Sequence, residues 1–192
     1  MNKILKIPYI LLDELLRVIE FFIVYSPKSR IGNLFRKLYW KLKLNIGKNP
    51  NIDRSTVFEN SHLIEIGDDF LAGVGVTFGA GDCKGIFVGN NVLVAQGTYL
   101  RSGNHNFVRT DIPIREQGHT CASIPFRDKE YSIIIENDCW IASNCTILSG
   151  SHIGEGSVLS ANTVVSGKIP PYSIVIGNPG RVIKNRKKME NR

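Results

Sequence analysis

The chain has 192 residues, of which 43% are hydrophobic, so it has enough apolar material for one domain with its own core. The formal net charge of +7 predicts an anionic partner, such as a phosphorylated cofactor, an acidic glycan or a membrane surface, and no nucleic-acid reading motif accompanies that charge. The four cysteines show no Cys-x-x-Cys spacing, so a structural zinc site is not expected. No signal-peptide pattern is seen, which favours a cytoplasmic protein with reduced thiols.

Residues 1–45 are expected to form an N-terminal helical segment. Apolar residues dominate from Ile4 to Tyr25, but charges interrupt them, so no run approaches the roughly 20 apolar residues of a membrane-spanning helix. Pro27 ends this amphipathic helix, and a second, basic and aromatic helix is predicted from Ile31 to Leu44. Two interpretations stay open: the helices cap the following domain or pack on a neighbouring subunit, or they make a peripheral contact with the inner face of the membrane.

From residue 46 the chain repeats with a period of six, which fits neither an α-helix nor a plain strand. It fits a short strand and a corner, stacked coil upon coil. We therefore predict an all-β fold, a parallel β-helix of about five coils over residues 46–180, with three flat faces. The inward column is Ile46, Ile52, Phe58, Ile66, Ala72, Phe78, Val88, Val94 and Leu100, then Ile135, Ile141, Ile147, Ile153, Leu159 and Val165. The corner column, rich in residues that tolerate left-handed backbone, is Asn49, Ser55, Ser61, Asp69, Gly75, Gly81, Asn91, Gly97, Gly103, Asp138, Asn144, Gly150, Gly156 and Asn162.

An inserted loop at 104–134 breaks the repeat, and loops of this length in a compact fold are usually functional. The coil has no room for it, so we expect it to project and to reach another subunit. His105 stands where the loop begins, and a neutral imidazole there can accept a proton from a hydroxyl. His62 and His152 are expected to be surface or packing residues, and the role of His119 stays open.

The segment from Gly103 to Lys184 resembles the hexapeptide-repeat, left-handed β-helix O-acetyltransferases, in the branch of maltose, galactoside and colanic-acid-type acetyltransferases. The matching motifs are Gly-Asn-His-Asn-Phe at 103–107, Pro-Ile-Arg-Glu-Gln-Gly at 113–118, Asn-Asp-Cys-Trp-Ile-Ala-Ser at 137–143, Leu-Ser-Ala-Asn-Thr-Val-Val at 159–165 and Ile-Pro-Pro-Tyr-Ser-Ile-Val-Ile-Gly-Asn-Pro-Gly-Arg-Val-Ile at 169–183.

The resemblance implies that His105 is the general base of a direct acetyl transfer from acetyl-CoA to an acceptor hydroxyl. We expect a saccharide acceptor in surface polysaccharide synthesis, because the basic, amphipathic start of the chain suggests a link to membrane-bound, lipid-linked glycans. It implies a homotrimer with CoA between adjacent prisms, an acceptor that is a saccharide or a lipid- or nucleotide-linked sugar, and no metal. Candidate CoA-binding residues are Trp140, Ser143, Ala161, Ser166, Gly167, Arg181 and Lys184, the last two within a basic C-terminal tail at 181–192.

Candidate acceptor-binding residues are Asn104, Arg115 and Glu116. Asn106 follows His105 where the family has a carboxylate, so the group that orients the imidazole is open, with Asn104 and Glu116 as candidates. Two other functions remain: an N-acyltransferase on a nucleotide-linked amino sugar, and a non-catalytic scaffold of the same shape. A zinc site of the carbonic-anhydrase type would need three imidazoles around one metal, and the sequence shows no close pair.

Overall fold

The computed structural model describes residues 3–81 and 83–189, and of residues 3–13 it describes the backbone alone. Parts of the two predicted terminal segments, residues 1–2 and 190–192, lie outside the described residues. The helices are α1 (Lys3–Val24) and α2 (Arg30–Lys43), with short 3-10 turns η1 (Ser61–Leu63), η2 (Ile114–Glu116) and η3 (Arg186–Lys188).

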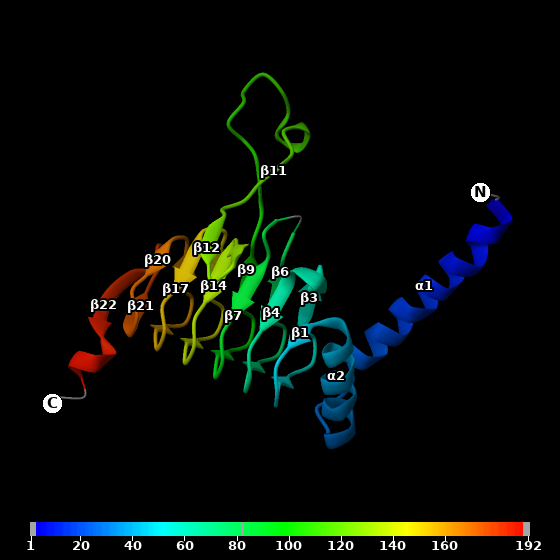
Figure 1. Ribbon diagram of the computed structural model, residues 1–192, viewed down its shortest axis with the longest axis horizontal. Coiled ribbons are helices and arrows are strands. Elements are labelled where there is room, and N and C mark those ends of the chain that lie inside the picture. Colours follow the sequence, from blue (N-terminus) through cyan, green and yellow to red (C-terminus); the bar gives the residue numbers. More distant parts are fainter. Residues whose placement is uncertain (1–2, 82, 190–192) are drawn as a thin grey trace.

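The strands are short and follow one another around a prism (Figure 1). Face A holds, in spatial order, β1 (Asn45–Ile46), β4 (Ile64–Ile66), β7 (Ile86–Val88), β14 (Ile133–Ile135), β17 (Ser151–Ile153) and β20 (Lys168–Ile169). Face B holds β2 (Asn51–Ile52), β5 (Leu71–Ala72), β8 (Leu93–Val94), β15 (Trp140–Ile141), β18 (Val158–Leu159), β21 (Ser173–Ile176) and the antiparallel β22 (Arg181–Asn185). Face C holds β3 (Val57–Glu59), β6 (Thr77–Gly79), β9 (Tyr99–Arg101), β16 (Thr146–Leu148) and β19 (Val164–Val165).

This arrangement confirms the predicted parallel β-helix but with about six coils instead of about five. The prediction ended the inward column at Val165, whereas Ile169 on β20 and Val175 on β21 continue it and are buried. Within the predicted basic C-terminal tail at 181–192, residues 181–185 form β22 at the edge of face B.

The predicted inward column fills the core. Every member except the half-buried Ile46 is buried. Phe58 and Phe78 stack with ring centroids 4.8 Å apart on neighbouring coils. Beside this column lie the buried Cys139 and Cys145, both free thiols, and burial raises the pKa of Cys139 to about 12. The thiols are therefore reduced, as predicted, and serve as small core groups.

The corner column adopts positive φ almost throughout, from Asn49 (φ 52°) to Asn162 (φ 60°). Two predicted corners are wrong. At the first, Asn60 (φ 51°) makes the turn, and Ser61 instead begins η1, because two extra residues are accommodated there. At the second, Gly103 stays out of the left-handed region because the chain leaves the coil at that point.

Helix α2 covers the end of the coil. For this helix, the structure agrees with the interpretation that the N-terminal segment caps the following domain. The buried Trp40 ring lies 4.8 Å from Phe58, centroid to centroid, at the first coil. The buried guanidinium of Arg36 donates to the carbonyl oxygens of Ser26, at 2.6 Å, and Ile52, at 3.3 Å. Arg36 thereby fastens both the turn between the helices and α2 itself to the coil.

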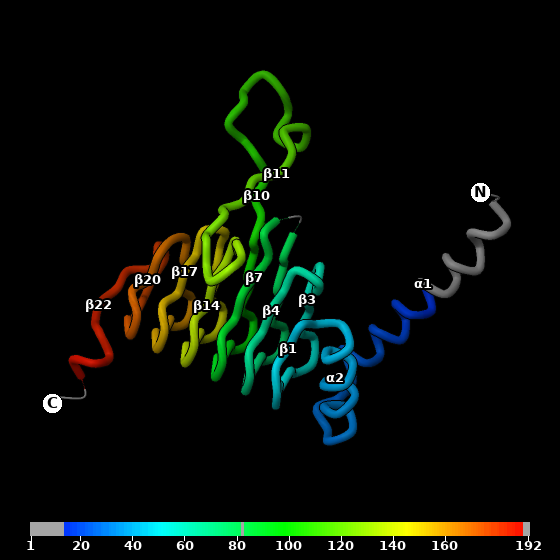
Figure 2. Tube along the Cα trace, viewed as in Figure 1, coloured from blue at the N-terminus to red at the C-terminus, as the bar shows by residue number. Residues whose placement is uncertain are grey.

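Only the first half of the inserted loop projects, which corrects the expectation for the whole segment. Residues 104–121 rise from the edge between faces C and A, with β10 (Asn104–His105) and β11 (His119–Thr120) at their foot (Figure 2). The second half instead returns as the hairpin of β12 (Ile124–Phe126) and β13 (Lys129–Tyr131). Its apolar side chains pack with Phe87 and Ile134 on the outer side of face A, which shields apolar surface that the coil would otherwise expose.

Candidate functional site

Two imidazoles lie together at the foot of the projecting loop. His105 on β10 and His119 on β11 are directly opposed in an antiparallel pair, and their ring centroids are 4.6 Å apart with planes inclined by 36°. The backbone N–H of Asn106 donates to the carbonyl oxygen of Gly118 at 3.0 Å, which extends the pairing. Both rings are exposed, so a nitrogen of either can reach a bound hydroxyl.

The outer part of the loop is held closed by one glutamine. The Gln117 side chain accepts from the backbone N–H of Arg109 at 2.9 Å and donates to the carbonyl oxygens of Arg109, at 2.7 Å, and Ile112, at 3.1 Å. Arg109 also forms an ion pair with Asp111. These contacts bring residues 109 and 117 together, and so bring the two ends of the projecting segment into register as β10 and β11.

A polar cavity of about 210 Å³ lies at the foot of the loop, beside His119. His119 lines it together with Glu59, Asn60, Cys83 and Arg101. Arg101 Nη1 lies 3.2 Å from Glu59 Oε2, so the cavity offers both a hydrogen-bond donor and an acceptor close to a proton-accepting ring.

The predicted acceptor-binding residues fall in two places. Asn104 stands beside His105 at the foot of the loop, opposite Thr120. Arg115 and Glu116 lie on η2 in the outer part of the loop, exposed, with Arg115 Nε 3.8 Å from Glu116 Oε1. Within the described part of the chain, no hydrogen bond joins the His105 ring to Asn104 or Glu116, and the group that packs on that ring is His119. Sequence analysis left His119 open because an antiparallel pair across a loop has no periodic signal.

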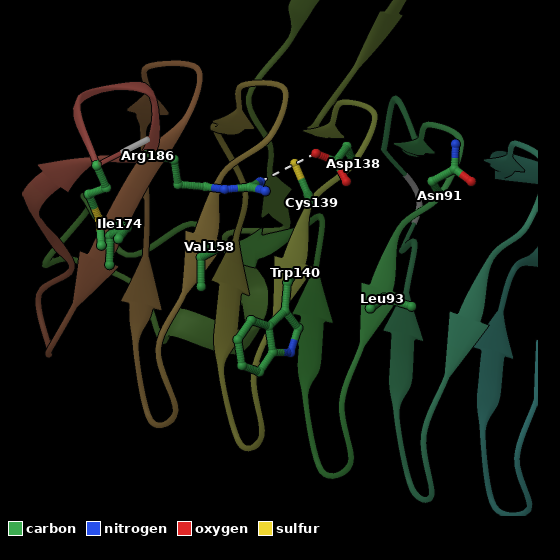
Figure 3. A pocket seen from close by; sticks show the side chains of 9 residues that line it. Asn91, Leu93, Asp138, Cys139, Trp140, Val158, Ile174 and Arg186 are labelled. Carbon is green, nitrogen blue, oxygen red and sulfur yellow. Dashed lines mark hydrogen bonds and ion pairs between the residues drawn. The ribbon is translucent and has the colours of Figure 1, made fainter. Parts of the chain in front are cut away.

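Trp140 stands on a different part of the prism, at the centre of a hollow on face B (Figure 3). It is half exposed and is flanked in register by Leu93 and Val158. These side chains and Ile174 line a cavity of about 540 Å³, a size typical of sites for small ligands.

Charged and flexible groups border the same hollow. Arg186 extends over it, with Nη1 3.3 Å from Asp138 Oδ2 and 2.5 Å from the carbonyl oxygen of Gly156. Met189 also lines it. Sequence analysis missed Arg186 as a site residue because it stands in a cluster of basic residues that gives no sign of which side chain turns back onto the coil.

The other predicted CoA-binding residues are divided among three places. Ser143 and Ala161 lie on neighbouring coils at the turn between faces B and C, where Ser143 accepts through its carbonyl oxygen from the N–H of Asn162. Ser166 and Gly167 lie between β19 and β20, on the edge that carries the histidine loop. Arg181 and Lys184 are exposed on β22, where Lys184 is opposite Ile174 at the border of the Trp140 hollow.

The described residues contain no group of three or more His, Cys, Asp and Glu side chains placed to hold a metal ion. Among the same residues, no helix has the length and apolar character needed to cross a bilayer.

The fold and motifs can be compared with known proteins. The bacterial transferase hexapeptide family model, of six repeats, matches residues 132–167. The chain is 32% identical over 145 residues to a probable acetyltransferase of Mycobacterium tuberculosis, covering 75% of this chain and 45% of that protein. It is 28% identical over 148 residues to a putative lipopolysaccharide biosynthesis O-acetyl transferase of Escherichia coli, covering 65% of this chain and 73% of that one.

A solved structure of a galactoside acetyltransferase in complex with coenzyme A has the same fold. It aligns with a TM-score of 0.70 at 23% identity, covering 92% of this chain and 81% of that one. This chain thus spans less than half the length of the mycobacterial relative and about three quarters of the Escherichia coli relative. The repeat, the fold and these relatives confirm the predicted resemblance to the hexapeptide-repeat acetyltransferases.

Proposed function

We propose that this protein is an acetyl-CoA-dependent O-acetyltransferase that acetylates a saccharide hydroxyl in surface polysaccharide synthesis. The observation that carries the proposal is the exposed His105 imidazole, which packs against His119 on the edge of the coil, where His119 lines a polar cavity. The similarity to a putative lipopolysaccharide O-acetyl transferase supports both the reaction and the acceptor class.

In this proposal His105 acts as the general base. A ring nitrogen accepts the proton of the acceptor hydroxyl while that oxygen forms a bond to the acetyl carbon and the carbon–sulfur bond of the thioester breaks. The imidazolium then returns its proton to the departing sulfur, so the ring ends neutral and no acyl group is held by the enzyme. His119 is the positioning residue, because its ring packs on that of His105 and restricts the directions that the base can take.

The Trp140 hollow fits the cosubstrate acetyl-CoA. Its apolar floor suits the pantetheine arm or the adenine ring, and Lys184 and Arg186 at its border, with Arg181 near them, supply positive charge for phosphate groups. Ser143 and Ala161 at one edge of the prism, and Ser166 and Gly167 at another, leave room for a thin chain to lie close to the backbone.

We propose that the active protein is a homotrimer, because these groups do not gather at one place on a single prism. The histidine loop leaves the edge between faces C and A, whereas Trp140 lies on face B and Ser143 at the edge between B and C. In a cyclic trimer the loop of one prism meets a different surface of the next, so one site draws on two chains.

Subunit mixing tests that arrangement. His105→Ala removes the base, and Ser143→Trp fills the proposed channel, so each homotrimer should be inactive. After equal amounts are unfolded and refolded together, about a quarter of the sites should combine an intact base with an intact channel, because each is supplied independently with a probability of one half. Activity near zero in the mixture would show that one chain supplies both groups.

The reaction itself is tested by thiol release from acetyl-CoA with a panel of hydroxyl and amino sugars. His105→Ala should lower kcat by about 10²–10⁴-fold while CoA binding in calorimetry stays unchanged. Transfer to amino sugars alone would replace the proposal by an N-acyltransferase, and failure of the wild-type protein to bind CoA would favour a scaffold.

A further inference from the structure

The face of α2 that points away from the coil is apolar. On the inner side, Gly32, Arg36 and Trp40 are buried. On the outer side, an exposed stripe at helical spacing has side chains from about half to almost fully exposed, with Leu42 at 88%. This stripe, the outer face of α2, consists of Ile31, Leu34, Phe35, Leu38 and Leu42.

Positive charge runs along one flank of this stripe. Arg30, Lys37 and Lys41 are separated by seven and four residues, so they follow one another on one side of the helix, next to the leucines. No acidic residue occurs anywhere in α2. On the opposite flank, Lys43 lies 5.8 Å from the Tyr39 ring centroid. An apolar stripe beside a cationic flank is typical of helices that lie at a membrane interface.

Helix α1 carries a second apolar stripe. Leu15, Val18, Ile19 and Phe22 are exposed at helical spacing, and Glu20 lies on the other side of the helix. The helix leaves the coil at its C-terminal end, where the carbonyl oxygen of the buried Val24 accepts from the N–H of Ser55 at 3.0 Å, and it extends away from the prism (Figure 1).

We propose that the outer face of α2, together with the apolar stripe of α1, docks the protein on an anionic membrane surface without spanning it. The leucines and aromatic rings enter the boundary between headgroups and acyl chains, and Arg30, Lys37 and Lys41 meet the anionic headgroups. A second copy of the chain is a poorer occupant, because apposed α2 helices would bring like cationic flanks together. Because α2 covers the end of the coil, docking leaves the histidine loop and face B free. The docking proposal does not depend on the proposed transferase chemistry.

The test is sedimentation of the full chain with vesicles of phosphatidylcholine alone or with phosphatidylserine. The wild-type protein should bind the anionic vesicles and bind the neutral ones far more weakly. Lys37→Gln with Lys41→Gln should weaken binding about 30-fold, at about 1 kcal/mol for each basic residue lost. Leu42→Glu should weaken it at least about tenfold, through loss of one buried leucine side chain.

Matched controls separate docking from general surface effects. Val108→Glu changes an apolar side chain that is 79% exposed on the projecting loop, and Lys168→Gln removes an exposed charge from face A. Both should bind vesicles like the wild type. The proposal is overturned if the wild-type protein ignores anionic vesicles, if the controls lose as much binding as the α2 variants, or if Leu42→Glu lowers the solution mass and shows that α2 contacts a second copy.

Discussion

Replacement of His119 separates a positioning role from a catalytic one. His119→Ala removes the ring that packs on His105 at a centroid distance of 4.6 Å and an angle of 36°. Ring contacts of this kind contribute about 0.5–1.5 kcal/mol. If that energy holds the base in its working orientation, its loss should lower kcat by about 2–12-fold, since 1.4 kcal/mol corresponds to a factor of ten.

The effect should fall on kcat and leave the KM for acetyl-CoA unchanged, because His119 lines the polar cavity at the loop foot and not the Trp140 hollow. His119→Phe keeps a planar ring without a proton-accepting nitrogen and should recover most of the rate. The assay is steady-state thiol release with a saccharide acceptor, beside His105→Ala. A loss of 10²–10⁴-fold in both His119 variants would refute the positioning role, because it would make His119 a base in its own right.

Three further changes test the groups that hold the helices and the cosubstrate. Arg36→Met leaves the half-buried carbonyl of Ser26 and the buried carbonyl of Ile52 without this donor, so urea unfolding should show a loss of about 2–4 kcal/mol. An unchanged free energy of unfolding would contradict the anchoring role of Arg36. Burial acts to raise the pKa of Asp53, but the hydrogen bond and charge of Lys28 hold that pKa below its usual value. The stability that this pair supplies is therefore present above about pH 4 and is lost as the pH falls through the folded-state pKa. Asp53→Asn should therefore flatten the fall in thermal midpoint below about pH 4, and an acid dependence equal to that of the wild type would count against the pair. Trp140→Ala should raise the KM for acetyl-CoA about tenfold while changing kcat little, because it removes a half-exposed ring from the proposed binding surface. An unaltered KM would place the cosubstrate elsewhere.

The coil was predictable because each hexad repeats the same local requirement. An inward Ile141 or Leu159 must be aliphatic to meet its neighbours above and below, and a corner such as Asn144 or Asn162 must tolerate positive φ. A requirement that recurs every six residues is visible without any knowledge of distant contacts. Ser61 shows the limit of that logic, since two extra residues move the turn to Asn60.

The hairpin and the imidazole pair carry no such signal. Residues 124–131 fold onto face A because the rings of Phe126 and Tyr131 pack against Phe87, which lies dozens of residues earlier in the chain. His119 lies opposite His105 because β10 pairs with β11 across the loop that Gln117 closes. Contacts that occur once, across long separations, are set by tertiary packing, which a single sequence does not reveal.

Both ends of the projecting segment are tied to the coil, and this determines which part of the loop can carry chemistry. Before His105, β9 pairs on both sides within face C. After His119, the N–H of Ala122 donates to Ser149 Oγ and the Ala122 carbonyl accepts from Ser132 Oγ, each at 2.8 Å.

The hairpin that follows is fixed as well, since Lys129 Nζ lies 2.6 Å from Glu65 Oε1 across face A. The two histidines therefore stand within four residues of anchored backbone. Among the described residues, Arg115 and Glu116 have contacts only within the loop itself. A proton-transfer group needs a fixed position more than an acceptor contact does, because small displacements cost rate steeply. The coil thus gives the proposed base a rigid attachment, and the outer loop can change with the acceptor without displacing that base.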